Sequence, residues 1–257
     1  MNTTSKSHNE RLLDPVGEEY SRAFALFLSG TDQKTVTQTY LSQIIAEMPR
    51  RDVFLDIGAG EGGTTEYIGR HFRKVVAIEP SAHMCKALHR ALPDAVVLSE
   101  PVETVQVDVK ADLALCAHVL YHLPHASWTA TIRRMLDWVV PGGELVVTLQ
   151  NPDDDAMRMS RYASGRLPFS LADLAVLLER EDSLGIADSG METLKATYRS
   201  PSRDDTLTVA QFMLGVPELT PANRQRLAEY VDQNFSAPDG SFKIGHSQDV
   251  LRLRKAQ

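Results

Sequence analysis

The 257-residue sequence lacks the features that mark membrane and secreted proteins. No stretch approaches the roughly 18 consecutive apolar residues that a membrane span needs. The start of the chain, Met1 to Arg11, is polar and has no apolar core behind a basic end, so we expect neither a secretory signal nor an anchor. Residues 1–18 are predicted to form a flexible tail, and the protein is expected to be cytoplasmic.

Dense clusters of basic residues are also missing, and the formal net charge is −7. Nucleic-acid-binding proteins rely on such clusters to displace counterions from phosphates. We therefore expect no nucleic-acid partner and no membrane partner. Cysteine is scarce as well. Cys85 and Cys116 lie in apolar surroundings on separate predicted elements, which favours two reduced core residues over a disulfide.

What the sequence does contain, from Val53 onward, is an alternation of strand-like and helix-like segments. This alternation is typical of a parallel sheet with helices on its faces. The predicted strands of the core are Asp52–Ile57, Lys74–Glu79, Ala95–Leu98, Ala111–Cys116 and Gly143–Leu149. The predicted helices between them are Thr64–Phe72, Ala82–Leu92 and Ser127–Val139.

Further helices are predicted on both sides of this core. One precedes it with Tyr20, Phe24, Phe27 and Leu28 on a single face, and an amphipathic helix follows from about Thr35 to Met48. The elements expected after the core are helices at Ala156–Ala163 and Ser170–Arg180, a strand at Leu194–Tyr198, helices near Leu207–Leu214 and Pro221–Asn234, and a last strand at Asp249–Leu253.

These elements predict an α/β fold, namely a Rossmann-like, open, mostly parallel seven-stranded sheet with helices on both faces and a helical cap. Residues 19–257 are expected to form one domain. Its expected parts are N-terminal lid helices (19–50), a cofactor-binding core (51–150), a helical cap with the sheet edge (151–246) and the last strand (247–257).

A glycine-rich turn, Gly58 to Gly63, follows the first predicted strand. Glycines let the backbone approach a ligand closely, and the helix that follows directs free amides at it. Gly58, Gly60 and Gly63 also satisfy the dinucleotide fingerprint, so the glycines alone do not separate NAD from S-adenosylmethionine. Asp56 precedes the turn. Its carboxylate suits a ligand with a free ammonium group and would repel a pyrophosphate, which favours S-adenosylmethionine.

Two more polar residues follow predicted strands of the same sheet. Glu79 ends the second strand, where a carboxylate can accept hydrogen bonds from ribose hydroxyls. His118 follows the fourth strand, and its reference pKa of about 6.5 suits proton transfer. His118 and His122 share a helical spacing that would also fit a metal. No acidic or thiol partner is obvious and Pro124 interrupts the helix, so we expect none.

In this order, Asp56 to Gly62, Glu79-Pro80-Ser81, Asp112 to Pro124 and Pro141-Gly142-Gly143 resemble the motifs of class I S-adenosylmethionine-dependent methyltransferases. The resemblance covers roughly Val53 to Leu149. It implies that Asp56 and Gly58 line the methionyl end of the cofactor, Glu79 the ribose, and Met84 with the Glu100-Pro101-Val102 turn the adenine. The implied cofactor-binding residues are Asp56, Gly58, Gly60, Gly62, Glu79, Pro80, Met84, Glu100, Pro101, Val102, Ala117 and His118.

Over most of the chain, the order of features is similar to the histamine N-methyltransferase group. The matching segments include Tyr20 to Leu28, Glu79 to Ala82, Val119 to Tyr121 and the strand after His246. Gln33 stands where that group has an acidic residue, unless Asp32 takes its place. This resemblance implies an N-terminal lid and the substrate-binding residues Tyr20, Phe24, Gln33, His118, Tyr121 and His246.

The leading hypothesis is a methyltransferase of secondary metabolism that acts on N or O of a small metabolite. His118 is its candidate catalytic base, and the protein is expected to be a monomer or homodimer. Two alternatives stay open. The first is a cyclase that converts S-adenosylmethionine into azetidine-2-carboxylate and methylthioadenosine, and the second is a non-catalytic cofactor-binding module.

Overall fold

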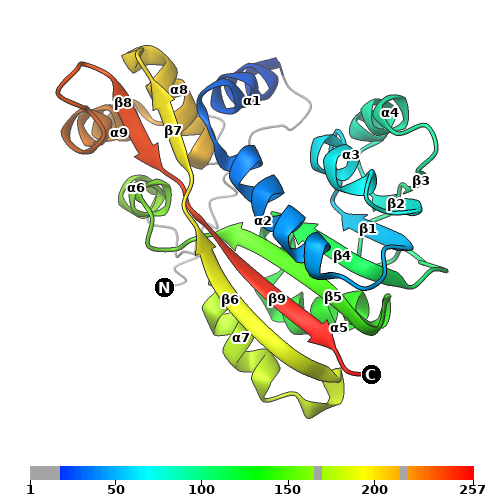
Figure 1. Cartoon of the computed structure of the whole chain (residues 1–257). Coiled ribbons are helices and arrows are strands. Elements are labelled where there is room, and N and C mark those ends of the chain that lie inside the picture. Colours follow the sequence, from blue (N-terminus) through cyan, green and yellow to red (C-terminus); the bar gives the residue numbers. More distant parts are fainter. Residues whose placement is uncertain (1–17, 165–169, 215–218) are drawn as a thin grey trace, which may run out of the picture. The chain divides into compact units, whose positions relative to one another are not determined.

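The computed structural model describes residues 18–164, 170–214 and 219–257 (Figure 1). Contacts divide the described chain into two compact units. The sheet unit comprises residues 32–152, 170–196 and 247–257, and the helical unit comprises the other described residues. Apart from Glu18, the predicted flexible tail lies outside the described residues. The single domain expected for 19–257 stays a prediction.

Seven strands form the main sheet, in the order β3-β2-β1-β4-β5-β9-β6 (Figure 1). Their bounds are β1 Val53–Ile57, β2 Lys74–Ile78, β3 Val96–Leu98, β4 Ala111–Ala117, β5 Val139–Gln150, β6 Ile186–Leu194 and β9 Gln248–Lys255. All pairs from β3 to β5 are parallel, and β9 is antiparallel to β5 and to β6. The predicted, mostly parallel seven-stranded sheet is therefore confirmed.

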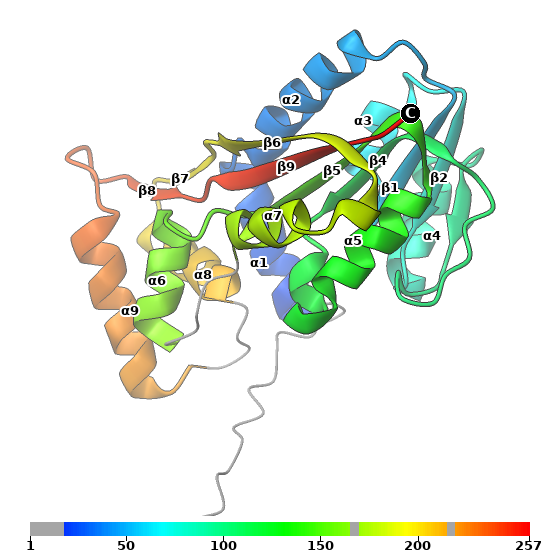
Figure 2. The same ribbon diagram turned by 90° about the horizontal axis from the view of Figure 1, so that it is seen from below.

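Helices cover both faces of this sheet (Figures 1 and 2). Their bounds are α2 Gln33–Glu47, α3 Gly63–Gly69, α4 Ala82–Ala91, α5 Trp128–Asp137 and α7 Leu171–Glu179, with 3-10 turns at Leu120–His122, His125–Ser127 and Asp182–Leu184. Successive strand residues point to opposite faces. Leu55 of β1 thus joins the core under α5 and α7, whereas Phe54 joins the core under α2 and α3.

The helical unit contains α1 Glu18–Gly30, α6 Asp155–Ser164, α8 Arg203–Leu214 and α9 Pro221–Asn234. It also contains an antiparallel pair of short strands, β7 Thr197–Ser200 and β8 Phe242–Gly245. Its own core gathers apolar side chains from all six elements, among them Phe27, Met159, Tyr198, Val209, Val231 and Ile244. The helices predicted near 156–163, 207–214 and 221–234 are all present.

The elements predicted from the sequence were wrong in three regions of the chain. The strand predicted at Leu194–Tyr198 is two strands, because β6 ends at Leu194 and β7 begins at Thr197. Most of β6 was missed because it is an exposed edge strand with little apolar alternation. The four-residue β8 was also missed. In addition, α5 ends at Asp137 and β5 begins at Val139, four residues before the predicted Gly143, with an irregular register opposite Ala111.

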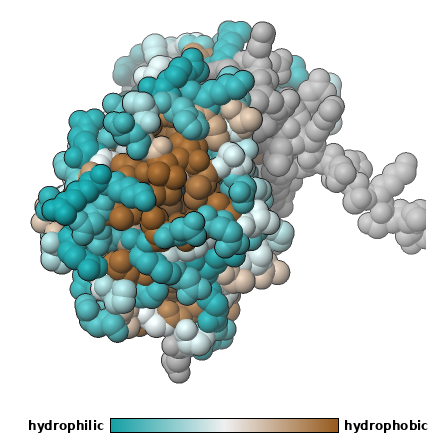
Figure 3. Space-filling view, turned by 90° about the vertical axis from the view of Figure 1, so that its right-hand side faces the viewer, coloured by the Kyte–Doolittle hydropathy of each residue, from teal (hydrophilic) through white to brown (hydrophobic). Residues whose placement is uncertain are grey.

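One face of the molecule carries a concentrated apolar area. It is the face on the right-hand side of Figure 1, where β2, β3 and α4 lie, and Figure 3 shows brown residues there surrounded by hydrophilic ones. Val96 of the edge strand β3 is 44% exposed.

Within the described ranges, none of the helices combines the length and apolar character needed to cross a membrane.

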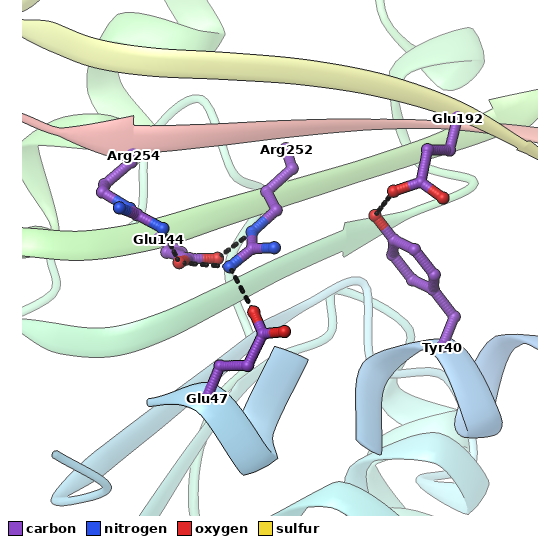
Figure 4. A network of polar contacts seen from close by, with 6 residues as sticks. All are labelled: Tyr40, Glu47, Glu144, Glu192, Arg252 and Arg254. Atoms are coloured by element: carbon purple, nitrogen blue, oxygen red, sulfur yellow. Dashed lines mark hydrogen bonds and ion pairs between the residues drawn. The ribbon is translucent and has the colours of Figure 1, made fainter. Parts of the chain in front are cut away.

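A network of charged side chains connects α2 to the sheet (Figure 4). At its centre Glu144 of β5, which is 5% exposed, accepts hydrogen bonds from Arg252 of β9 at 2.5 and 2.7 Å. Arg254 lies 3.5 Å from the same carboxylate, and Glu47 of α2 lies 3.7 Å from Arg252. The carboxylate of Glu144 is thus buried but fully compensated by bidentate pairing.

A second contact between α2 and the sheet lies beside this network. The Tyr40 hydroxyl donates to Glu192 of β6 at 3.2 Å (Figure 4). Burial, together with the negative charge of Glu192, raises the pKa of Tyr40 to about 12. The hydroxyl therefore stays protonated at neutral pH and remains a donor.

Replacement of Glu144 by Ala should destabilise the protein by roughly 2–3 kcal/mol, because the partly buried Arg252 guanidinium loses its bidentate partner and keeps only the longer contact with Glu47. Urea unfolding followed by circular dichroism measures this change. Glu192→Gln is the matched control and should cost less than about 0.5 kcal/mol, because Glu192 is exposed and Gln still accepts from Tyr40. Equal losses in the two variants would contradict a structural role specific to Glu144.

Candidate active site

The predicted cofactor residues converge on one edge of the sheet. In the parallel register Ile57 of β1 pairs with Ile78 of β2 and with Cys116 of β4, so these three strands end side by side. The residues that follow them, Gly58, Glu79 and His118, therefore lie along the same edge. Ligands of open α/β sheets bind at such an edge.

The glycine turn has the backbone conformation that its sequence predicts. Gly58, Gly60 and Gly62 have φ values of 78°, 57° and 89°, which other residues rarely adopt. A Cβ atom on Gly58 would collide with Val119, whereas one on Gly60 would meet nothing within 4 Å. The turn is thus packed against the β4 side at Gly58 and leaves open space at Gly60.

Asp56 of β1 lies beneath the turn and is 3% exposed. Its Oδ2 accepts a hydrogen bond from the Thr65 hydroxyl at 2.7 Å. Within the described chain, Oδ1 accepts no hydrogen bond. Burial is the main cause that raises the pKa of Asp56 to about 6; the Thr65 hydrogen bond opposes this shift, and the negative charge of Glu79 adds to it. The ionised carboxylate therefore gains from any cation that reaches Oδ1.

Glu79 follows β2 and is 6% exposed. Its Oε2 accepts from the Gly60 amide at 2.8 Å, and its Oε1 accepts from the Ser81 amide at 2.9 Å. An ionised carboxylate has about four acceptor positions, so two remain for hydroxyl donors. The same side chain thus shapes the glycine turn and keeps the capacity to bind a ribose.

The residues predicted to contact adenine differ in exposure. Pro80, Glu100 and Pro101 are exposed, and Met84 is partly buried near the start of α4. Val102 is 5% exposed and belongs to the main core of the sheet unit. Packing in the core is enough to explain an apolar residue at position 102. Any contact of the Glu100-Pro101-Val102 turn with adenine would therefore come from Glu100, from Pro101 or from the backbone.

Both cysteines are buried, Cys85 on α4 and Cys116 on β4, and neither forms a disulfide. The Cys85 thiol donates to the Glu79 carbonyl at 2.9 Å. Burial raises the pKa of both thiols. They are therefore protonated core residues rather than nucleophiles.

His118 follows β4, where Ala117 is the last strand residue, and its backbone is left-handed with φ 58°. Its Nε2 lies 3.0 Å from Oε1 of Gln248 and 3.0 Å from Nε2 of Gln33. The Tyr121 ring centroid is 6.1 Å from the His118 ring. Burial lowers the pKa of His118, so the ring is neutral at pH 7. Three predicted substrate residues, Gln33, His118 and Tyr121, are thus neighbours within the sheet unit.

The other predicted substrate residues belong to the helical unit. Phe24 is partly buried, with its ring centroid 5.9 Å from that of Phe212. His246 is 1% exposed, and its Nε2 lies 2.7 Å from the Thr31 hydroxyl. Tyr20 lies on α1, but its side chain is outside the described structure. Phe24 and His246 therefore contribute to packing within the helical unit, and their contact with substrate stays a prediction.

Sequence reasoning missed three polar residues close to these sites. Gln248 and Thr37 are buried and connect β9 to α2 beside His118. Lys34 places its Nζ beside Gly63, at the end of the glycine turn. Each stands alone in a segment whose pattern only predicts a helix or strand. A polar side chain in such a pattern gives no sign of its partner.

Solved structures share this fold at low sequence identity. A candidate methyltransferase from Bacillus halodurans has a TM-score of 0.63 and 16% identity over 86% of this chain and 99% of that one. N-methyltransferase NodS from Bradyrhizobium japonicum, in complex with S-adenosylhomocysteine, has a TM-score of 0.56 and 15% identity over 94% and 100%. Phosphoethanolamine N-methyltransferase 2 from Haemonchus contortus has a TM-score of 0.54 and 13% identity, over 86% of this chain and 52% of that one.

Curated relatives are more similar over shorter spans. Ribosomal RNA small subunit methyltransferase A from Alkaliphilus metalliredigens is 32% identical over 136 residues, which are 48% of this chain and 45% of that protein. The chain spans less than half the length of the curated relatives it matches.

Residues 32–182 match the methyltransferase domain family, a span of more than half of the chain. The glycine turn, Asp56, Glu79 and His118 all lie in it. The match agrees with the predicted cofactor, S-adenosylmethionine. By this match, on the fold described above, the protein belongs to the methyltransferase domain family.

Proposed function

We propose that the protein transfers a methyl group from S-adenosylmethionine to a nitrogen or oxygen atom of a small molecule. The observation that carries this proposal is the combination of two features at one edge of the sheet. The first is a pair formed by a buried carboxylate, Asp56, and the open glycine turn after β1. The second is a neutral histidine, His118, after the neighbouring strand β4. The first pair suits a cationic nucleoside cofactor, and the histidine suits proton transfer.

The residues present fit this cofactor. Oδ1 of Asp56 has an open acceptor position for the ammonium group, and Glu79 keeps two for the ribose hydroxyls. The open side of Gly60 leaves room for a close approach to the backbone. When bound, S-adenosylmethionine supplies a methyl group activated by its attachment to a positively charged sulfur.

Lys34 is a further candidate for the cofactor site. Its ammonium group lies beside Gly63, on the same turn as the residues above. The methionyl end of the cofactor carries a carboxylate as well as an ammonium group. We assign the carboxylate to Lys34 and the ammonium to Asp56, because each then meets a charge of opposite sign.

The charge distribution supports a small acceptor rather than RNA. The curated relatives act on ribosomal RNA, but they match at most about half of this chain. The protein has 34 acidic against 27 basic residues. Binding to a phosphate backbone draws on the release of counterions by clustered basic residues. Such clusters do not occur in this sequence.

His118 is proposed as the catalytic residue that accepts the acceptor's proton. Gln33 and Tyr121 lie beside it and are proposed to orient the acceptor. Methyl transfer depends mainly on positioning and on exclusion of water, and a base contributes where the acceptor loses a proton. The likeness to histamine N-methyltransferases, and the substrate contacts of Tyr20, Phe24 and His246, stay predictions within this proposal.

Purified protein incubated with S-adenosylmethionine should form S-adenosylhomocysteine only when an acceptor is added. The nucleoside product is identified by mass spectrometry, with a dialysable metabolite extract, purified ribosomal RNA, or no acceptor. Product with the extract alone supports the proposal. Methylthioadenosine without an acceptor would indicate cyclisation instead, product with RNA alone would overturn the small-molecule acceptor, and cofactor binding without any product would indicate a binding module.

Asp56→Asn should weaken cofactor binding at pH 8 at least tenfold, because the amide keeps the Thr65 bond but cannot pair with an ammonium group. The same variant should stabilise the free protein. An aspartate whose pKa rises from 3.8 to about 6 on folding penalises the folded state above pH 6, and the penalty disappears as pH falls toward 4.

The expected gain is on the order of 3 kcal/mol at pH 8 and close to zero at pH 4. Calorimetric titration measures the affinity, and thermal unfolding at the two pH values measures the stability. Binding to the wild-type protein should weaken as pH falls through 6, when Asp56 gains a proton. Unchanged affinity in the variant would remove Asp56 from the cofactor site.

Lys34→Met should lower the affinity for S-adenosylmethionine several-fold and should lower the affinity for 5′-methylthioadenosine little, because only the former carries the methionyl carboxylate. Lys86→Met, at an exposed position on α4, is the matched control. Calorimetry with both ligands checks the result. An equal loss for both ligands would assign Lys34 a general electrostatic or structural effect.

A further inference from the structure

A short chain of hydrogen bonds ends at the ring of His118, and every link lies within the sheet unit. It runs from the carbonyl of Gln33 through the Thr37 hydroxyl to the side-chain amide of Gln248, and from there to Nε2 of His118. Thr37 is 8% exposed and Gln248 is 1% exposed. Water therefore has little access to these links, and their donors and acceptors must match one another.

The direction of each bond follows from its partners. A backbone carbonyl can only accept, so the Thr37 hydroxyl donates to Gln33 O at 2.9 Å. The same oxygen must then accept from Gln248, whose Nε2 lies 2.5 Å away. Once its nitrogen faces Thr37, Gln248 presents its Oε1 to His118 at 3.0 Å. An amide oxygen only accepts, so Nε2 of His118 must carry a hydrogen.

A neutral imidazole carries one ring hydrogen, so Nδ1 of His118 then has a free lone pair. Nδ1 receives no hydrogen bond from any described residue. We propose that Gln248, held by Thr37, fixes His118 as the Nε2-protonated tautomer and so makes Nδ1 the atom that accepts the proton of the methyl acceptor. This inference rests on the proposed function. His118 is its catalytic residue, and Gln248 is a positioning residue.

Gln33 is consistent with this tautomer in one of its two amide orientations. In the structure, the amide nitrogen Nε2 of Gln33 lies 3.0 Å from Nε2 of His118, so this tautomer requires the other orientation. A second N–H cannot bond to a nitrogen that already carries a hydrogen, so the Gln33 amide must turn its oxygen toward His118. The two orientations of an amide have nearly the same shape, and the hydrogen-bond network decides between them.

All groups in this chain of hydrogen bonds are neutral, and this affects proton transfer to His118. The partners of Nε2 are uncharged amides rather than a carboxylate, which would favour the imidazolium. In the reaction the acceptor's lone pair bonds to the methyl carbon, the carbon–sulfur bond breaks with its electron pair left on sulfur, and the acceptor's proton passes to Nδ1. An imidazolium results, and it returns its proton to solvent after product release.

The tautomer can be observed directly by NMR of ¹⁵N-histidine-labelled protein at pH 8, where the ring is neutral. The two ring nitrogens differ in chemical shift according to which one carries the hydrogen, and the His118 signals are assigned by their loss in His118→Gln. We expect Nε2 of His118 to be protonated and Nδ1 to be bare. A protonated Nδ1 would overturn the inference without reference to activity.

Three variants test the role of Gln248. Gln248→Leu should shift the tautomer ratio toward Nδ1–H and lower kcat tenfold or more with little change in KM, and Thr37→Val should shift it partly by freeing the Gln248 amide. Gln248→Glu keeps an acceptor at Nε2, so it should retain the tautomer. Asp249→Asn is the matched control, because Asp249 is buried beside Gln248 but bonds to Asn151 and Thr193.

The control should leave both the His118 signals and kcat unchanged. An unchanged tautomer and kcat in a folded Gln248→Leu variant, or wild-type kcat in His118→Ala, would overturn the inference. Calorimetry with S-adenosylmethionine examines the proposed function separately, since loss of cofactor binding by the wild-type protein would contradict that function while the tautomer remained measurable.

Discussion

The parallel pairing of β1 with both β2 and β4 is the constraint on which the candidate site depends. Parallel strands in register end at one edge, so Asp56 with the glycine turn, Glu79 and His118 are neighbours although they are far apart in the sequence. This pairing is stabilised by nearly continuous burial of the strands, between the helices on the two faces of the sheet. The core thereby determines where the polar residues meet.

Placing carboxylates at this edge has an electrostatic cost. Asp56 and Glu79 are both nearly inaccessible to water, and burial together with their mutual repulsion raises the pKa of Asp56. Glu79 is compensated by two backbone amides, whereas Asp56 has one hydroxyl donor. The free protein therefore holds an incompletely compensated negative charge. A cationic ligand would supply the missing compensation. The buried charge of Asp56 would thus lower the stability of the ligand-free protein and raise its affinity for a cationic cofactor.

The surroundings of His118 contain neutral hydrogen-bond partners instead of charged ones. Its Nε2 is bonded to neutral amides that are themselves held from α2 and β9, and its backbone has a left-handed conformation that few residues adopt. The carboxylate end of the site thus interacts through charge, and the histidine end through the direction of hydrogen bonds. In the proposed reaction, the carboxylate end would bind the cationic cofactor, and the histidine end would receive a proton from an acceptor that loses one.

The sequence alone determined the fold class, the glycine turn, and the identities of Asp56 and Glu79 as residues at strand ends, because periodicity and glycine spacing are local properties. It did not reveal β6, since an exposed edge strand lacks alternation, nor the division into two units. Tertiary structure alone decided the partners of His118. Gln33, Thr37 and Gln248 come from helix and strand segments up to 215 positions apart, and hydrogen-bond direction exists only once such groups are within reach of one another.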